Sequence, residues 1–141
     1  MSTPNPVLGG GGFHHVAIKT RDWDRTMKFY QDTLGFRVKI GWNAAPKRAI
    51  MLDTGDGNYL EVFEDLAFAP PPGGSIVHIA LRTTRLDAVM EAVRATGAKI
   101  TMEPKDVAIA VTTGGGPVPA RLGFFEGPSG EVVELFQNAL T

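Results

Sequence analysis

Apolar residues recur along the chain at two spacings, one typical of strands and one typical of helices. Apolar and polar positions alternate over 14–20 and again over 77–83, which predicts two half-buried strands because successive strand side chains point to opposite faces. Segments 21–36 and 84–98 instead repeat every three or four residues, which predicts two amphipathic helices. The pattern therefore predicts a strand followed by a helix in each half of the chain.

The apolar faces of the two expected helices match each other. They consist of Trp23, Met27, Tyr30 and Leu34 in the first helix and of Leu86, Met90 and Val93 in the second. Asp22 is a suitable N-cap for the first helix, since its side chain can accept a hydrogen bond from a free backbone N–H. Gly35 and Gly97 are placed to end the helices in the left-handed conformation.

The two strand–helix segments are copies of one repeat. "HHVAIKT" and "VHIALRT" lie 63 positions apart and align His15 with His78, Ala17 with Ala80, Lys19 with Arg82 and Thr20 with Thr83. Further along, an offset of 73 aligns Arg48 with Arg121, Gly57 with Gly130, Glu61 with Glu134 and Phe63 with Phe136. The difference of ten residues fits the loop 110–119, which we expect to be a hairpin extension or a mobile flap.

Each half also contains three later strands. Segments 47–64 and 120–137 each predict two strands around a Gly-containing turn, and each half has room for another strand at 36–42 or 98–104. We therefore predict an α+β fold of two βαβββ modules that share one core. The expected domain boundaries are a flexible arm at 1–12 and a single domain at 13–141, with module one at 13–64, a Pro/Gly linker at 65–75 and module two at 76–138.

One face of the expected strands carries a His and a Glu from each module. Alternation places His15, Glu61, His78 and Glu134 on the face turned away from the helices. A solvent-exposed face with four ordinary polar residues is one interpretation, but the neighbours on that face are apolar: Tyr59, Phe63, Val132 and Phe136. Buried carboxylates need partners, and two carboxylates with two neutral imidazoles carry a charge of -2, which one divalent cation neutralises.

A mixed nitrogen and oxygen donor set favours Zn²⁺, Ni²⁺, Co²⁺, Mn²⁺ or Fe²⁺ over Ca²⁺. The chain has no cysteine, which excludes disulfides and thiolate ligands. The net charge of the 141-residue chain is -1, so the sequence gives no sign of a basic surface for nucleic acid. No apolar run reaches the roughly 20 residues that a membrane span needs. We expect no nucleic-acid or membrane partner, a small-molecule substrate and, without a secretory signal at the N-terminus, a cytoplasmic location.

The chain resembles the vicinal oxygen chelate superfamily, the glyoxalase/bleomycin resistance/dioxygenase group. The segments that carry the resemblance are "HHVAIKTRDWDRTMKFYQDTLGF", "NYLEVFE", "VHIAL" and "GPSGEVVELFQ". The resemblance spans Phe13 to Asn138 and implies a U-shaped, half-open barrel of two βαβββ modules around a metal cavity. Many members of the family are homodimers, so we expect a homodimer.

The ligand pattern most resembles that of bacterial glyoxalase I. The resemblance implies metal ligation by His15, Glu61, His78 and Glu134, with Glu134 as the proton-transferring carboxylate and Glu61 as a possible second base. It implies proton transfer on a small vicinal-oxygen substrate such as a 2-oxoaldehyde, a hemithioacetal, or a 2-oxo or hydroxy acid. Two positions that hold glutathione in that family are here Lys19 and Asp65 rather than Arg and Asn. Asp65 would repel the carboxylates of glutathione.

Several assignments stay open at this level. Lys19 and Arg82 clamp an anionic substrate or extend into solvent, while Tyr59, Phe63 and Phe136 are candidate substrate-binding walls. An extradiol-type Fe²⁺ dioxygenase needs two His and one carboxylate, so a fourth ligand speaks against it. A non-enzymatic binding protein of the bleomycin-resistance type needs aromatic walls but no metal. His14 alternates to the face opposite His15 and is interpreted as a strand-start residue.

Overall fold

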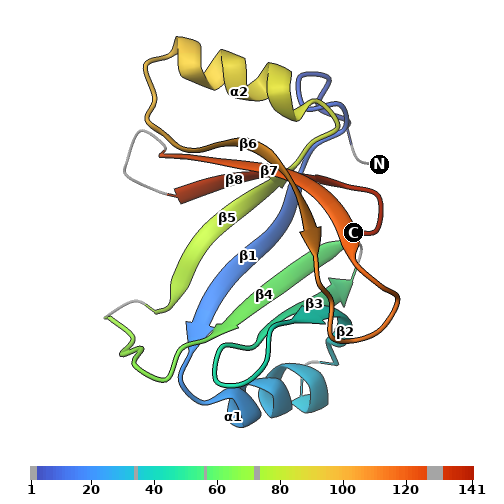
Figure 1. Cartoon of the computed structure of the whole chain (residues 1–141), viewed down its shortest axis with the longest axis vertical. Helices are drawn as coiled ribbons and strands as arrows, with labels where there is room; N and C mark the ends of the chain where they lie inside the picture. Colours follow the sequence, from blue (N-terminus) through green and yellow to red (C-terminus); the bar gives the residue numbers. More distant parts are fainter. Residues whose placement is uncertain (1–2, 34, 56, 72–73, 127–131) are drawn as a thin grey trace. The chain divides into compact units, whose positions relative to one another are not determined.

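The protein is described by a computed structural model covering residues 3–33, 35–55, 57–71, 74–126 and 132–141. Its chain divides into two compact units (Figure 1). The first unit consists of residues 15–77 and 110–117, and the second consists of residues 1–14, 78–109 and 118–141. Strands β1 and β5 each begin in one unit and continue in the other.

The first unit has the strand order β2-β3-β4-β1. Its elements are β1 (Phe13–Thr20), α1 (Trp23–Met27), the π-helix η1 (Lys28–Thr33), β2 (Arg37–Trp42), β3 (Ala49–Gly55) and β4 (Asn58–Glu64). Strand β1 runs parallel to β4, whereas β3 is antiparallel to both of its neighbours. The predicted β-α-β-β-β order is confirmed in this half of the chain.

The helix of the first unit differs in one respect from the expected continuous α-helix. Its second half is a π-helix, whose backbone hydrogen bonds span five residues instead of four. The predicted N-cap is confirmed, because the Asp22 carboxylate accepts a hydrogen bond from the Arg25 N–H at 3.1 Å. Gly35 follows with a φ of 74°, the predicted left-handed ending. Leu34, expected on the apolar face, lies outside the described residues.

The core of the first unit lies between this helix and one face of its sheet. Ile50, Leu52 and Val62 are buried there, and the helical face expected from the sequence packs against them through Trp23, Met27 and Tyr30, with Ile18, Phe36 and Leu60 alongside. Residues 18, 60 and 62 thus face the helix as predicted. Since strand side chains alternate, His15 and Glu61 point to the other face.

The second unit repeats this plan with the order β5-β8-β7-β6. Its elements are β5 (Ile76–Arg82), α2 (Leu86–Ala95), β6 (Ile100–Ile109), β7 (Val118–Glu126) and β8 (Val132–Asn138). Strand β5 is parallel to β8, and β7 is antiparallel to β6 and β8. The turn expected at 127–130, which includes Gly130, lies outside the described residues.

Helix α2 packs on the sheet of the second unit in the same way. Leu86, Val89 and Met90 are buried together with Leu135 of β8, and Leu81, Val93 and Phe125 are among the residues packed around them. Gly123 of β7 leaves room for this packing, because an added Cβ would lie 2.6 Å from the Met90 methyl carbon. Gly97 has a φ of 83° and ends the helical segment as predicted.

Each unit also contains a segment from the other half of the chain. The N-terminal segment belongs to the second unit: the carbonyls of Leu8 and Gly12 accept hydrogen bonds from Thr84 N–H and Arg82 N–H at 3.0 and 2.8 Å. The expected flexibility of this arm stays a prediction. Conversely, residues 110–117 belong to the first unit, where the Thr113 hydroxyl accepts a hydrogen bond from Gly41 N–H at 3.0 Å.

The two units confirm the α+β class and the duplicated βαβββ plan. Both helices of the described chain cover one sheet face within their own unit (Figure 1). Within the described residues, neither helix is long and apolar enough to cross a bilayer. The predicted His and Glu ligands are therefore expected on the opposite sheet face of each unit.

Candidate metal centre

The first unit pairs His15 with Glu61. The two residues lie on β1 and β4, which are adjacent and parallel, with His15 in register with Tyr59 and Ala17 in register with Glu61. Glu61 therefore lies on the neighbouring strand, two residues beyond the position directly opposite His15. Nε2 of His15 lies 3.1 Å from Oε2 of Glu61, and both side chains are buried.

The second unit repeats this pair with His78 and Glu134. Strands β5 and β8 are again adjacent and parallel, with Ala80 in register with Glu134. Nε2 of His78 lies 3.1 Å from Oε2 of Glu134, and both side chains are buried. Each unit thus brings together one His and one Glu of the predicted ligand set, in the same relative position on its own strands.

The residues on either side of each carboxylate explain how the diagonal contact forms. Ala17 and Ala80 are completely buried directly opposite Glu61 and Glu134, and their methyl groups leave space for the imidazole to reach the carboxylate. Across the other strand, Met51 faces Glu61. Phe124 faces Glu134 in the second unit.

Met51 and Phe124 are neighbours of the two carboxylates that the sequence reasoning did not single out. They are repeat equivalents at the offset of 73, which is the signal that could have identified them. Met51 is completely buried, and the ring of Phe124 packs edge-on against His78 with centroids 5.5 Å apart. Apolar neighbours of this kind exclude water and strengthen electrostatic interactions at the carboxylates.

The electrostatics of each pair allow two ways to compensate a buried carboxylate. A neutral imidazole beside a carboxylate leaves a charge of -1, which a bound cation or a proton on the imidazole neutralises. Each pair offers one nitrogen and one oxygen donor, a set suited to borderline divalent ions. The donor chemistry of the two pairs therefore fits the expected metal, with a combined charge of -2.

The predicted substrate-binding residues of the first unit are Tyr59 and Phe63 on β4 and Lys19 near the end of β1. Tyr59 and Phe63 share the face of β4 that carries Glu61, and the Phe63 ring packs edge-on against Trp42 with centroids 6.2 Å apart. The Lys19 ammonium lies 3.4 Å from the Asp65 carboxylate, so Lys19 and Asp65 pair with each other. This ion pair compensates part of the charge that Lys19 could offer a substrate.

The predicted substrate-binding residues of the second unit have contacts that hold the chain ends. The Arg82 guanidinium donates to the Phe13 carbonyl at 3.5 Å. Phe136 is buried and packs on the ring of His14 with centroids 4.4 Å apart, while His14 also contacts the Thr141 hydroxyl. His14 thus has an aromatic and a hydroxyl partner within the second unit.

Comparisons with known proteins find similarity along most of the chain. The family model described as Glyoxalase/Bleomycin resistance protein/Dioxygenase superfamily matches residues 12–135. A lactoylglutathione lyase from Haemophilus influenzae is 33% identical over 134 residues, covering 90% of this chain and 93% of that protein. The crystal structure of methylmalonyl-CoA epimerase from Mycobacterium tuberculosis aligns with a TM-score of 0.71 at 22% identity, covering 99% of this chain and 93% of that one.

A putative lactoylglutathione lyase from Brassica oleracea is 31% identical over 147 residues. That match covers 92% of this chain but only 45% of the plant protein, so the chain spans about half the length of this relative. The likeness to the epimerase structure shows that the chain has the fold of that enzyme. It extends over both units, as the repeat predicts.

Proposed function

The chain belongs to the glyoxalase/bleomycin resistance protein/dioxygenase superfamily, and we propose that it is a metal-dependent lyase or isomerase that transfers a proton next to a substrate carbonyl. The observation that carries the proposal is the repeated pair: each unit buries one His and one Glu with Nε2 and Oε2 3.1 Å apart. Two buried carboxylates in apolar surroundings are costly unless they are compensated, and one divalent cation compensates both while the two imidazoles stay neutral. The enzymes among its relatives support a catalytic role.

His15, Glu61, His78 and Glu134 are the residues that would hold one divalent ion, each pair contributing a nitrogen and an oxygen donor. A divalent ion bound there supplies Lewis acidity to vicinal oxygens of the substrate. Zn²⁺, Ni²⁺, Co²⁺, Mn²⁺ and Fe²⁺ all accept this donor set.

Glu134 is proposed to accept the proton α to the carbonyl and to return it, with Glu61 as the second carboxylate. His15 and His78 keep their partners in place through the 3.1 Å contacts. Ala17 and Ala80 leave room for those contacts, and Met51 and Phe124 limit access of water to the carboxylates. The remaining proposed substrate contacts are Tyr59, Phe63, Phe136, Lys19 and Arg82.

The substrate class is proposed to be a small vicinal-oxygen compound such as a hemithioacetal or a 2-oxo acid derivative. Asp65, which neutralises Lys19 at 3.4 Å, disfavours a substrate as anionic as a glutathione adduct. Epimerisation is the second candidate, because the chain shares the fold of a methylmalonyl-CoA epimerase. Both reactions begin with removal of a proton α to a carbonyl, and two carboxylates provide one base for each side of the carbon.

Metal content of the purified protein, reloaded with each divalent ion in turn, tests the proposal. We expect one ion per chain, with His15→Ala and His78→Ala each losing at least tenfold in metal affinity. His14→Ala is the matched control: its ring packs on Phe136, and it should keep the wild-type metal content. Unchanged metal affinity in both His15→Ala and His78→Ala would contradict the proposal.

The metal-loaded protein should then be assayed with methylglyoxal and a panel of thiols, and with a 2-methylmalonyl thioester. Turnover of the first points to a lyase, whereas exchange of the α-proton of the second points to an epimerase. Oxygen uptake with catechols after Fe²⁺ loading would instead favour a dioxygenase. Undiminished ligand affinity in the metal-free protein would favour a binding protein of the bleomycin-resistance type.

The quaternary structure is proposed to be a homodimer, as the resemblance implies. Light scattering on the eluting protein should give about twice the mass of the 15.1 kDa chain. A mass of one chain at micromolar concentration would contradict the dimer without affecting the metal proposal.

A further inference from the structure

A pocket of about 590 Å³ lies in the first unit at the C-terminal end of β1. Its walls come from the end of β1, from α1 and the start of η1, and from Phe68, Pro70 and Ser75 in the segment that follows β4. Ile18 is the lining residue closest in sequence to a proposed ligand on β1. It is three residues beyond His15, which corresponds to roughly 10 Å along a strand, and its side chain points to the opposite face. The pocket is therefore separate from the His15–Glu61 pair.

The lining of this pocket is strongly basic. It contains Lys19, Arg21, Arg25 and Lys28 but only one carboxylate, Asp22, so four cations and one anion leave a net charge of +3. Asp22 already accepts the hydrogen bond that caps α1. Lys19 pairs with Asp65, but no ion pair to Arg21, Arg25 or Lys28 occurs among the residues that the structure describes. Three cations are thus available to an anionic ligand.

The pocket also has an apolar wall. Ile18, Tyr30, Phe68 and Pro70 line it together with the hydroxyl-bearing residues Thr20, Thr26 and Ser75. Tyr30 is held in place by stacking on Phe36, with ring centroids 5.4 Å apart. Guanidinium groups bind phosphate oxygens in pairs, and aromatic rings accept a flat organic group. The lining therefore suits a ligand with an anionic end and an apolar end.

The duplicated fold offers an internal control for this charge. The offset of 63 aligns Lys19, Arg21, Arg25 and Lys28 with Arg82, Thr84, Ala88 and Glu91. Only the first of these four positions is basic in the second unit, although helix α2 forms there and packs equally well on its sheet. The βαβββ plan thus does not require cations at these positions, so the basic lining calls for an explanation of its own.

We propose that this pocket binds a phosphate-bearing small molecule, with Arg21, Arg25 and Lys28 contacting the phosphate and Tyr30 and Phe68 contacting its apolar portion. The proposal does not rest on the metal centre, because every lining residue belongs to the first unit and none is a proposed metal ligand. Free phosphate and a nucleotide share the chemistry that the cations recognise, but only a nucleotide also occupies the apolar wall.

Isothermal titration calorimetry with inorganic phosphate and with ADP tests the proposal on the full chain. The protein is kept metal-free with EDTA, so that metal-bridged binding of ADP is excluded. We expect ADP to bind at least tenfold more tightly than phosphate. Phe68→Ala should weaken ADP binding about tenfold and leave phosphate binding unchanged, since only ADP reaches that ring.

Arg25→Glu should weaken binding of both probes at least tenfold, because it replaces a cation by an anion at the phosphate. The substitution is compatible with the helix, since Glu three residues after the Asp22 cap is favoured there. Lys47→Glu is the matched control: it changes the net charge equally on an exposed site of the same unit outside this pocket. Arg21→Glu provides a second variant if Arg25→Glu loses its circular-dichroism signature.

Equal losses in Arg25→Glu and Lys47→Glu would overturn the proposal, because nonspecific charge would then explain the binding. Absence of saturable binding of both probes up to several millimolar would overturn it as well. Neither outcome depends on metal content or turnover, which are measured separately, so failure of this pocket is distinguishable from failure of the proposed enzyme activity.

Discussion

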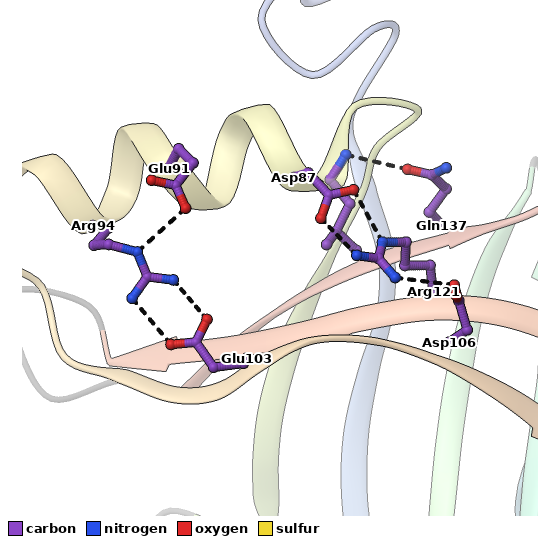
Figure 2. Close-up of polar contacts among 8 residues, drawn as sticks. Asp87, Glu91, Arg94, Glu103, Asp106, Arg121 and Gln137 are labelled. Atoms are coloured by element: carbon purple, nitrogen blue, oxygen red, sulfur yellow. Dashed lines mark hydrogen bonds and ion pairs between the residues drawn. The ribbon is translucent and has the colours of Figure 1, made fainter.

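The two units carry an arginine at the same repeat position, Arg48 immediately before β3 and Arg121 within β7, but the two arginines have different partners. Arg48 forms two hydrogen bonds to the Glu64 carboxylate, at 2.7 and 2.8 Å, and lies over the ring of Trp23. Arg121 reaches Asp87 of α2 at 2.7 Å and Asp106 of β6 at 3.1 Å (Figure 2). The Glu64 side chain is 4% exposed, whereas the two aspartates are 66% and 82% exposed.

The helices of the two units receive their N-terminal hydrogen bonds from different parts of the repeat. In the first unit Asp22, the residue immediately before α1, caps the helix, and position 64 holds the carboxylate that binds Arg48. In the second unit the equivalent position is Gln137, whose side-chain carbonyl accepts the Leu86 N–H at 3.1 Å (Figure 2). One position of the repeat therefore serves a buried ion pair in one unit and a helix cap in the other.

This comparison separates what the duplicated fold requires from what each unit adds. Both units keep the His–Glu pair, the small residue opposite the carboxylate and the packed helix. The ion pairs around the helices differ, including the second network of α2, in which Arg94 binds Glu91 and Glu103 (Figure 2). Features shared by both units are the better candidates for chemistry.

The largest expected difference between the units is catalytic. Glu134→Gln should lower kcat by about 10²- to 10⁴-fold, since an amide cannot accept the substrate proton. Glu61→Gln should lower kcat less if Glu61 acts chiefly as a ligand, and its main effect should be weaker metal binding. Steady-state kinetics of the metal-saturated variants, on the substrate identified by the assays above, measure both effects.

Glu103→Gln serves as the control for this pair. It removes a carboxylate of the second unit that binds Arg94 and lies on β6, so kcat should stay within twofold of the wild type. Equal losses of kcat in Glu61→Gln and Glu134→Gln, at equal metal occupancy, would contradict the assigned division of roles and would favour the epimerase, which needs both bases.

The second-largest expected difference is in the stability lost when a methionine of each helix is replaced by alanine. Met90 is completely buried, so Met90→Ala should lower the free energy of unfolding by about 2–5 kcal/mol through lost contacts and a cavity. Met27 is only half-buried, and Met27→Ala should cost roughly 1 kcal/mol. Urea unfolding followed by circular dichroism measures both changes.

A double variant sharpens this prediction. Gly123→Ala alone should be destabilising, because the new methyl would lie 2.6 Å from the Met90 methyl carbon. In the Met90→Ala background the same methyl has space, so the double variant should lose less stability than the sum of the single variants. Additive losses would show that Met90 and Gly123 do not share this volume.

The sequence was sufficient to predict the elements that depend on periodicity. Alternation predicts that Ile18, Leu60 and Val62 face the first helix, as they do. The repeat predicts one His and one Glu from each half on the opposite face, but not that each His contacts the Glu of its own unit on a neighbouring strand. Periodicity did not reveal the π-helix at 28–33, because α- and π-helical spacing place the same residues on one face over only two turns.

Contacts between residues far apart in sequence could not be predicted in the same way. Neither the exchange of residues 1–14 and 110–117 between the two units nor the Gln137 cap has a local signature, because each depends on which strands become neighbours. Met51 and Phe124 could have been found by applying the offset of 73 to every residue of the third strand. Strand alternation does not predict the basic pocket, because Arg21, Arg25 and Lys28 come from the segment that follows β1.

The smallest predicted effect is the pH dependence contributed by the two arginines. Hydrogen bonds from Arg48 hold the pKa of the Glu64 carboxyl below its usual range, and those from Arg121 lower the pKa of Asp87. A carboxyl with a lowered pKa in the folded state adds stability above its unfolded pKa of about 4.3 for Glu, and this contribution is lost as the pH falls through the folded pKa.

Arg48→Met should therefore lower the urea midpoint at pH 7, and the difference from the wild type should shrink as the pH falls below the ordinary Glu pKa of about 4.3 and through the lowered pKa of Glu64. Arg121→Met should change the midpoint less at pH 7, because water and salt already screen its exposed aspartates. Midpoints measured from pH 3 to 7 in both variants check this order. A larger loss in Arg121→Met would mean that tying α2 to two strands stabilises the protein more than a buried ion pair, and that the exposed network, not Glu64, governs the acid sensitivity of the fold.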